Sequence, residues 1–148
     1  MEPNRYAVTV DAIVLTTRDG ALHVLLIRRR NEPFPGGWAL PGGFVDPDED
    51  LPDAVARELA EETGIELAPA DCAQIGAYGA PGRDPRGRTI SIAFAVVRDG
   101  LPDPRDGDDA GDAAFLPVDR VLSGETALAF DHHRILTDAV SALPAASG

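Results

Sequence analysis

Hydrophobic and polar positions along the first part of the chain follow a strand pattern. Two apolar runs, 7–16 (AVTVDAIVLT) and 22–28 (LHVLLIR), have the length and the β-branched content of β-strands. They are separated by Asp19-Gly20, a dipeptide typical of tight hairpin turns. The pattern predicts that the two runs pair as an antiparallel hairpin.

The pattern changes to a helical one after a loop rich in glycine and proline at residues 33–43. A helix is predicted over residues 51–63. Asp50 is suited to cap its first turn, with Asp53 three residues further along, and Gly64 suits the left-handed position after the last turn. These residues set both ends of the predicted helix.

The second half of the chain alternates between strand-like and turn-like segments. Strands are predicted over 74–80, 89–98 and 113–116. Residues 99–112 are dense in Asp, Gly and Pro and predict a mobile acidic loop. A final helix is predicted over 130–143, whose apolar side carries Ile135, Leu136, Ala139, Val140 and Leu143.

This order of strands and helices predicts one fold class. There is no internal repeat, and a chain of 148 residues has the length of one ordinary domain. We therefore expect a single domain over residues 1–148, of class α/β, with a mixed β-sheet covered by helices as an α/β/α sandwich.

Composition and charge exclude several classes of protein. No apolar run approaches the roughly 20 residues of a membrane span, and the N-terminus lacks a secretory pattern. The single cysteine, Cys72, cannot form an internal disulfide, so a cytoplasmic protein is expected. The formal net charge of −12 disfavours a nucleic-acid partner. All cationic side chains are arginines, which excludes lysine Schiff-base chemistry and a Walker A lysine.

Three glutamates lie close together on the helix predicted at 51–63. Glu58, Glu61 and Glu62 stand at i, i+3 and i+4, within an arc of roughly 100°. This arc overlaps the apolar stripe that includes Val55 and Leu59, so the carboxylates are expected to be partly desolvated and to repel one another. A hard divalent cation relieves that repulsion, and ligands that are all oxygen indicate Mg²⁺, with Mn²⁺ as a substitute, rather than zinc.

The alternative is a solvent-exposed acidic helix that only aids solubility, which is common for segments rich in glutamate. Two neighbouring features favour the metal site. Arg57 precedes Glu61 by four residues and can orient it. Pro41, Gly42 and Gly43 let the backbone approach closely, so a glycine carbonyl can serve as a further ligand.

Residues 43–65 resemble the Nudix box, in which G, E, REU, EE and GU stand at fixed spacings and U is aliphatic. Every position is matched, by Gly43, Glu49, Arg57, Glu58, Leu59, Glu61, Glu62, Gly64 and Ile65. Seven fixed letters at about 7% background frequency each give a chance match of about 10⁻⁶ over the chain. The segment is identified as a Nudix box, and the flanking strand pattern is similar to the family's fold over nearly the whole chain.

The resemblance implies roles for the acids of the box. In such enzymes the residues that match Glu61 and Glu62 bind the metals, and the residue that matches Glu58 binds a metal or helps to activate water. The acid matching Glu49 braces the loop against the helix through the arginine matching Arg57. Water then attacks phosphorus while the cations neutralise the diphosphate.

Two further roles implied by the resemblance lie outside the helix. The glycine just before the box, here Gly42, offers its carbonyl to a metal. The general base of relatives often lies in a flexible loop, so the acids of 99–112 are candidates. Asp112 is the predicted base, with a shorter side chain than the glutamate that relatives more often carry there.

Segments 78–91 (YGAPGRDPRGRTIS) and 129–136 (AFDHHRIL) resemble a Nudix subgroup of ADP-ribose pyrophosphatases and repressor domains that sense NAD metabolism. The resemblance implies a small nucleotide substrate, ADP-ribose, cleaved to AMP and ribose 5-phosphate. Another sugar nucleotide, a dinucleotide or a modified nucleoside triphosphate is an alternative substrate. A non-catalytic ADP-ribose sensor is a third possibility, which the complete set of box glutamates disfavours. Related enzymes are commonly homodimers, so a homodimer is expected.

Arginines near the box are candidate phosphate contacts, because their guanidinium groups donate in a fork. Arg83, Arg86 and Arg88 share one loop, and at least one of them is expected only to aid solubility. The run 28–30 ends the second predicted strand. Arg28, Arg83 and Arg88 are the predicted substrate contacts.

Aromatic and histidine side chains near the site have two interpretations each. Trp38 and Phe44 flank the glycine loop, and Phe44 is the predicted contact for the base, although packing is the more common use of such a ring. His132 and His133 begin the last helix, and because adjacent residues cannot share a helix face, at most one of them can face the site. A surface or capping role is favoured over catalysis for both.

Overall fold

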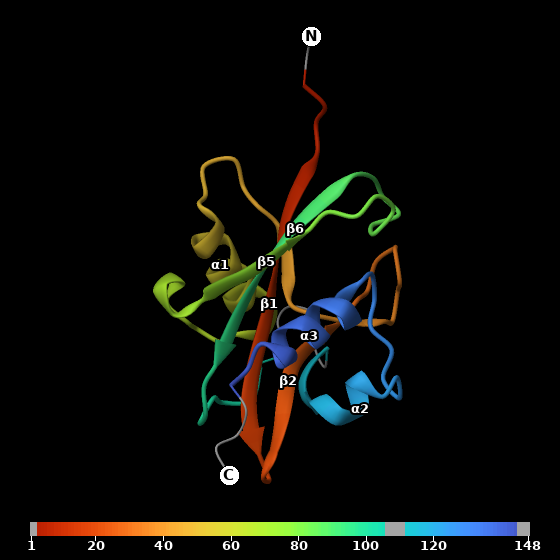
Figure 1. The fold of residues 1–148 in the computed structure, drawn as a ribbon. Helices are drawn as coiled ribbons and strands as arrows, with labels where there is room; N and C mark the ends of the chain where they lie inside the picture. Colours follow the sequence, from red (N-terminus) through yellow and green to blue (C-terminus); the bar gives the residue numbers. More distant parts are fainter. Residues whose placement is uncertain (1–2, 106–111, 145–148) are drawn as a thin grey trace.

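The computed structural model describes residues 3–105 and 112–144 (Figure 1). The described strands and helices are β1 (Ala7–Arg18), β2 (Ala21–Arg28), β3 (Trp38–Ala39), β4 (Gly42–Phe44), α1 (Leu51–Thr63), a 3₁₀ turn (Pro69–Asp71), β5 (Ala73–Tyr78), β6 (Thr89–Val97), β7 (Ala113–Pro117), α2 (Val118–Leu122) and α3 (His132–Ser141). The part of the acidic loop at 106–111 lies outside the described residues.

The described strands form one mixed sheet. Five of them follow the order β3-β2-β1-β6-β5, while β4 pairs with β1 and β7 pairs with β2. Strands β1 and β6 are parallel, and the other pairs are antiparallel. Helix α1 lies on one side of the sheet, and α2 and α3 lie on the other (Figure 1). The predicted α/β class with a helix-covered mixed sheet is confirmed.

The predicted hairpin between β1 and β2 is also confirmed. Arg18 pairs with Ala21 at its end, and the two turn residues, Asp19 and Gly20, both have positive φ, at 52° and 74°. Positive φ at both central positions is the geometry of a type I′ turn, whose twist matches that of paired strands.

Strand β1 supplies both layers of the core. Val10 and Val14 face α1, where they pack with Leu59, while Ile13 and Leu15 belong to the cluster that includes α3. Successive side chains of a strand point to opposite faces, so a strand with helices on both faces is apolar at almost every position. This explains why residues 7–16 show a nearly continuous apolar run.

Helix α1 begins and ends where the sequence predicts. The Asp50 side chain accepts a hydrogen bond from the backbone N–H of Leu51 at 2.8 Å. Gly64 has φ 73° and its N–H donates to the carbonyl of Ala60 at 3.0 Å. Local capping chemistry therefore fixes the helix that carries the acidic residues.

Other elements differ from the prediction. Helix α3 spans His132–Ser141 rather than 130–143, because Phe130 has a left-handed backbone with φ 54° that a helix cannot include. Strands β3 and β4 have two and three residues and α2 has five, too short to give a periodic signal.

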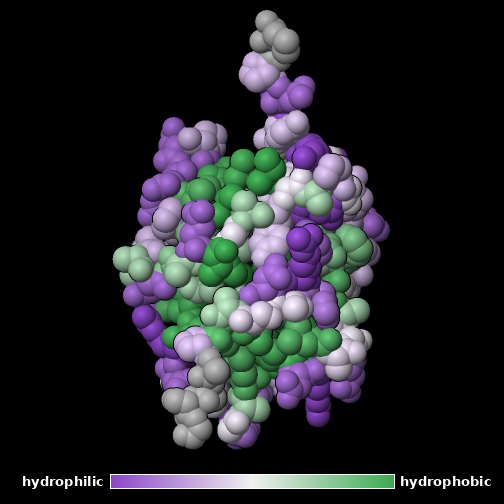
Figure 2. Space-filling view, in the orientation of Figure 1, coloured by the Kyte–Doolittle hydropathy of each residue, from purple (hydrophilic) through white to green (hydrophobic). Residues whose placement is uncertain are grey.

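The surface is mixed in character. On the face shown in Figure 2, hydrophobic residues gather above and below a hydrophilic band. The larger apolar side chains left exposed include Tyr6 (46%), Val97 (56%) and Phe44 (48%). Within the described residues, no helix is both long and apolar enough to cross a membrane.

Candidate active site

A cavity of about 170 Å³ opens between strand β1, the β3–β4 segment and the loop before β6. Its lining contains the carboxyl groups of Asp11 and Glu62 and the guanidinium groups of Arg29, Arg83 and Arg86. A cavity with acids and arginines on its wall is suited to a phosphate ligand only if the acids hold a cation.

Two glycines bring the backbone of β4 against the acids of α1. A Cβ added to Gly42 would lie 2.1 Å from the carbonyl oxygen of Val10, on the strand with which β4 pairs. A Cβ added to Gly43 would lie 2.5 Å from Oε1 of Glu58. The Val10 carbonyl therefore excludes a side chain at Gly42, and the Glu58 carboxylate occupies the space that a side chain at Gly43 would fill.

Arg57 binds the acids of the box from one side. Its Nε and Nη2 donate to the two carboxylate oxygens of Glu49 at 2.7 and 2.8 Å. Its Nη1 donates to Glu58 at 2.9 Å and to Glu61 at 3.2 Å, and Nη2 also donates to the carbonyl of Phe44 at 3.2 Å. The hydrogen bonds from Arg57 lower the pKa of Glu49 to about 2, and those to Glu49 raise the pKa of Arg57. The side chain thus ties the loop after β4 to α1, as the sequence predicts.

Glu62 points from α1 into the cavity. Its Oε1 accepts a hydrogen bond from the backbone N–H of Gly42 at 2.8 Å. Burial raises the pKa of Glu62 to about 8, with smaller contributions in the same direction from the charges of Glu58 and Asp11. Burial also raises the pKa of Glu58, and the two carboxyl groups share a hydrogen bond. The raised pKa favours the protonated form of Glu62, whose carboxyl group hydrogen-bonds to Glu58.

The structure separates the predicted arginine contacts. The lining of the cavity, within the described part of the chain, includes Arg83 but neither Arg28 nor Arg88. The Arg83 side chain is only 4% exposed and donates two hydrogen bonds to Asp131, at 2.6 and 2.9 Å. Arg88 lies over the ring of Tyr6 at 5.1 Å. Arg28 lies over the ring of Trp38 at 4.9 Å, so neither of the candidates Arg28 and Arg88 lines this cavity in the structure.

Arg29 and Arg86, which were not among the predicted substrate contacts, line the cavity. Arg86 pairs with Asp84 at 2.7 Å and lies over the rings of Phe44 and Phe130 at 5.0 and 5.5 Å. Arg29 lies over the ring of Phe130 at 4.9 Å. Burial lowers the pKa of Arg29, and the charge of Arg86 lowers it further, so an anion between the two guanidinium groups would be stabilised. The arginine run 28–30 was the sequence signal for Arg29.

Trp38 packs in the core, whereas Phe44 lies at the cavity. Arg28 lies over the ring of Trp38 at 4.9 Å, and Trp38 packs against the core cluster on the α3 side. Phe44 lines the cavity as predicted, with Arg86 over its ring. Packing thus accounts for Trp38, while Phe44 is placed where it can contact a ligand.

Among the buried polar residues that line the cavity, sequence reasoning missed Asp11 and His132 as parts of the site. They are 6% and 4% exposed, so the expected surface or capping role is wrong for His132. His133 is exposed and contacts the carbonyl of Leu122 at 3.1 Å, which agrees with a surface role. The one charged residue in the apolar run 7–16 is Asp11, and this was the signal available in the sequence.

Comparison with known proteins decides the family. The family model of the NUDIX domain matches residues 5–139. The chain belongs to the Nudix family. The predictions of a Nudix box and of a Nudix pyrophosphohydrolase are confirmed by this match together with the relative described next.

Relatives in sequence include a Nudix enzyme and a regulator. The chain is 44% identical over 132 residues to the ADP-ribose pyrophosphatase of Methanocaldococcus jannaschii, with 89% of this chain and 72% of that protein covered. It is 33% identical over 137 residues to the ADPR responsive transcriptional repressor NtrR of Acinetobacter baylyi. That match covers 91% of this chain but 53% of the repressor. The predicted subgroup is confirmed.

A solved Nudix structure shares the fold. The NUDIX domain of Shewanella oneidensis NrtR, complexed with ADP ribose, superposes with a TM-score of 0.85 and 33% identity. The superposition covers 95% of this chain and 90% of that chain. The ADP ribose bound in that structure contains a diphosphate linkage, the kind of bond expected in the substrate of this chain.

Nudix hydrolases generally use divalent metal ions, and the acids of this chain fit such an ion in their chemistry. Within residues 3–105 and 112–144, no three histidine, cysteine or acidic side chains converge on one point. Glu61 is 60% exposed and contacts Arg57, whereas Glu58 and Glu62 contact each other. Carboxyl oxygens that share a proton beside an open glycine backbone form a donor set that a hard cation can enter in place of the proton.

The predicted general base does not reach the cavity in this structure. Oδ2 of Asp112 lies 3.2 Å from Nε of Arg30, and its backbone carbonyl accepts a hydrogen bond from the N–H of Arg28 at 2.7 Å. Two other acids of the segment 99–112 contact the region of the β1–β2 hairpin, namely Asp99 through Thr17 and Asp103 through Arg18. The assignment of Asp112 as base stays a prediction.

Arg57→Lys tests the bracing contact within the Nudix box. Lysine keeps the charge but loses the fork that binds both oxygens of Glu49, so we expect kcat to fall about tenfold or more. Arg98→Lys is the matched control, because Arg98 forms an exposed pair with Asp71 away from the cavity. Steady-state kinetics on both variants measure the effect, and equal rates for Arg57→Lys and wild type would contradict the role.

Proposed function

We propose that this Nudix hydrolase cleaves the diphosphate linkage of ADP-ribose and releases AMP and ribose 5-phosphate. Mg²⁺ is the proposed cofactor. The observation that carries the proposal is the cavity whose lining includes the carboxyl group of Glu62 together with the arginines Arg29 and Arg86. The 44% identity to an ADP-ribose pyrophosphatase supports the choice of substrate.

The residues divide the work in this proposal. Glu58, Glu61, Glu62 and the carbonyl of Gly42 are the proposed metal ligands. A bound Mg²⁺ supplies neutralisation of the diphosphate charge and a water of lowered pKa. Arg29 and Arg86 donate to the phosphate oxygens, each held in place by contact with the ring of Phe130.

Other parts of the site are proposed to orient these groups. Arg57 fixes the box acids through its contacts with Glu49 and Glu58. Arg83 is proposed to shape the cavity, because both of its donated bonds already go to Asp131. Phe44 is proposed to contact the base or sugar of the nucleotide, since its ring is exposed and lines the cavity.

A pair of arginine variants tests the proposed phosphate contacts. Arg86→Ala should raise the KM for ADP-ribose about tenfold or more, because a charge-assisted contact to phosphate is lost. Arg88→Ala is the matched control in the same loop and should change KM by less than about twofold, because Arg88 lies outside the cavity. Initial rates over a range of ADP-ribose concentrations decide; a larger effect for Arg88→Ala would reverse the assignment.

The activity itself is tested with purified protein, ADP-ribose and Mg²⁺, with AMP and ribose 5-phosphate separated by chromatography. We expect stoichiometric formation of both products, loss of turnover with EDTA, and recovery with Mg²⁺ or Mn²⁺. A panel with another sugar nucleotide, a dinucleotide and a modified nucleoside triphosphate separates the alternative substrates. No AMP at micromolar enzyme would overturn the proposal.

A second candidate function is a non-catalytic ADP-ribose sensor. It is favoured by the resemblance to the ADPR responsive repressor and by the ADP-ribose complex of the NrtR domain. The complete set of box acids argues against it, because binding alone does not require four glutamates around one loop. Calorimetric binding of ADP-ribose with no turnover in Mn²⁺ would favour the sensor.

The proposal extends to assembly and location. A homodimer and a cytoplasmic location are retained as expectations, with no nucleic-acid partner because of the net charge of −12. Exposed apolar side chains such as Tyr6 and Val8 give a second copy a surface to bury. Sedimentation velocity at micromolar concentration measures the mass, and a monomer would contradict the expected dimer.

A further inference from the structure

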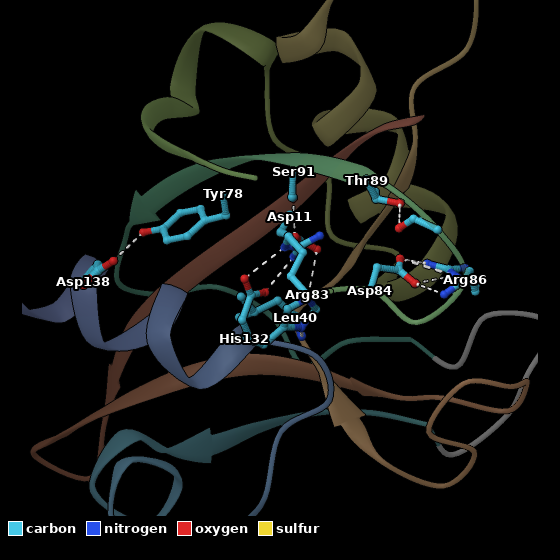
Figure 3. Close-up of polar contacts among 12 residues, drawn as sticks. Asp11, Leu40, Tyr78, Arg83, Asp84, Arg86, Thr89, Ser91, His132 and Asp138 are labelled. Carbon is cyan, nitrogen blue, oxygen red and sulfur yellow. Dashed lines mark hydrogen bonds and ion pairs between the residues drawn. The ribbon is translucent and has the colours of Figure 1, made fainter. Parts of the chain in front are cut away.

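Three buried polar side chains from separate elements meet beside the cavity. Asp11 lies on β1, Ser91 on β6 and His132 at the start of α3, and they are 6%, 0% and 4% exposed. The Ser91 hydroxyl donates to Oδ2 of Asp11, and Nε2 of His132 lies 3.4 Å from Oδ1 of the same carboxylate (Figure 3). The proposed function assigns no role to any of them.

The contacts of His132 define which ring nitrogen carries the proton. The backbone N–H of Leu40 donates to Nδ1 of His132 at 3.0 Å. Nδ1 must therefore offer a lone pair, and in a neutral ring the proton is on Nε2, where it faces the Asp11 carboxylate. Burial lowers the pKa of His132, which agrees with a neutral ring. The Asp11 carboxylate, 3.4 Å from Nε2, favours the same tautomer in which His132 accepts from Leu40.

Leu40 begins the short backbone segment that reaches the acids of the box. Pro41 follows it, and its carbonyl accepts a hydrogen bond from the N–H of Ala12 at 2.8 Å. The N–H of Gly42 then donates to Oε1 of Glu62 at 2.8 Å. Only Pro41 lies between the residue whose N–H binds His132 and the residue whose N–H binds Glu62, so a shift of Leu40 is transmitted to Gly42.

We propose that His132 is a positioning residue of the Nudix site: with its tautomer set by Asp11, it holds the 40–42 backbone so that Gly42 orients Glu62 and presents its own carbonyl to the cation. The inference rests on the proposed metal site but not on the identity of the substrate. His132 acts through the backbone and does not touch the reacting atoms.

The contacts of Asp11, Ser91 and His132 do more than supply hydrogen-bond partners for buried polar groups. Helix α3 packs on the sheet through apolar residues such as Ile135 and Leu136, so an apolar side chain at 132 would serve packing alone. A buried carboxylate with its partners generally costs stability relative to apolar residues of similar size. Here Asp11 and His132 both line the cavity that contains Glu62, at the point where α3 reaches the β3–β4 segment. Fixing backbone geometry there is a function that offsets this cost.

Two measurements on the metal-free wild-type protein test the contacts without any assay of turnover. Nitrogen-15 chemical shifts should report a neutral His132 ring with the proton on Nε2. Amide hydrogen exchange should show protected N–H groups at Leu40 and Gly42. A proton on Nδ1, or rapid exchange at Leu40, would overturn the proposal.

Variants at 132 test the consequence for the metal site. His132→Phe keeps a ring of similar size but removes the nitrogen that accepts the hydrogen bond from Leu40. Mn²⁺ affinity or kcat should therefore fall about 10- to 100-fold, while the KM for the nucleotide changes much less. His132→Asn retains an acceptor near the position of Nδ1 and should recover part of the loss. His133→Phe, on the same helix but exposed, is the matched control and should behave as wild type.

The outcomes separate this inference from the proposed function. Wild-type Mn²⁺ affinity and Leu40 protection in a folded His132→Phe protein would overturn the positioning role. Equal losses in His132→Phe and His132→Asn would also overturn it, because the acceptor would then be irrelevant. If ADP-ribose is not hydrolysed but Mn²⁺ affinity, exchange and tautomer respond as expected, the proposed substrate fails and the positioning role stands.

Discussion

Glu62→Gln is expected to lower kcat by at least about 100-fold while the fold is retained, as for the loss of a metal ligand that acts in the transition state. The Glu62 side chain faces the cavity and is oriented by the N–H of Gly42. Glutamine preserves the shape and still accepts this hydrogen bond, but it has no negative charge to offer a cation.

The measurement is steady-state hydrolysis of ADP-ribose at saturating Mg²⁺, with circular dichroism to check the fold. Glu66→Gln is the matched control, because Glu66 is an exposed glutamate just beyond the box. Its rate should lie within about twofold of wild type. An unchanged kcat in Glu62→Gln would refute the metal assignment and, with it, the proposed reaction.

The second large effect is a loss of stability of the metal-free protein as pH rises. Burial raises the pKa of Glu62 from 4.5 to about 8, so the folded state holds a proton that the unfolded state has released. A group with a raised folded pKa contributes stability that is present below the unfolded pKa and is lost as pH rises through the folded pKa. In EDTA the free energy of unfolding should therefore decline up to about pH 8.

The useful window lies between pH 6.5 and pH 8. The pKa of the buried His132 is lowered from 6.5, so protonation of the unfolded state opposes folding below that pH and masks the effect of Glu62. Above pH 6.5 most of the unfolded-state His132 is neutral, as it is in the folded state. One carboxyl group with a raised folded pKa then changes the free energy of unfolding by about 1.4 kcal/mol per pH unit. The expected loss over this window is about 2 kcal/mol.

Urea unfolding at several pH values in EDTA measures this slope. Glu62→Gln removes the titrating group and should flatten the curve, whereas Glu66→Gln should leave it unchanged. Added Mg²⁺ should restore stability most strongly at the upper end of the range, because the cation replaces the proton. A flat curve for the wild-type protein would show that Glu62 is ionised at neutral pH in the folded state.

The sequence by itself determined the parts of this protein that depend on neighbours along the chain. Helix α1 begins at the residue that Asp50 caps and ends at Gly64, and the β1–β2 hairpin turns at Asp19-Gly20. The Nudix box could be recognised for the same reason. Its acids are spaced by the helical repeat, so their relative placement on one side of α1 follows from local geometry.

Only the tertiary structure decided which residues complete the site, because these contacts join positions far apart in the chain. The choice of Arg29 and Arg86 over Arg28 and Arg88 depends on which side of β2 and of the loop faces the cavity. His132 meets Leu40 across 92 positions of sequence, a contact that no local pattern encodes. The raised pKa of Glu62 likewise comes mainly from its burial in the folded chain, so the sequence supplies the carboxylates and tertiary packing shifts their pKa values.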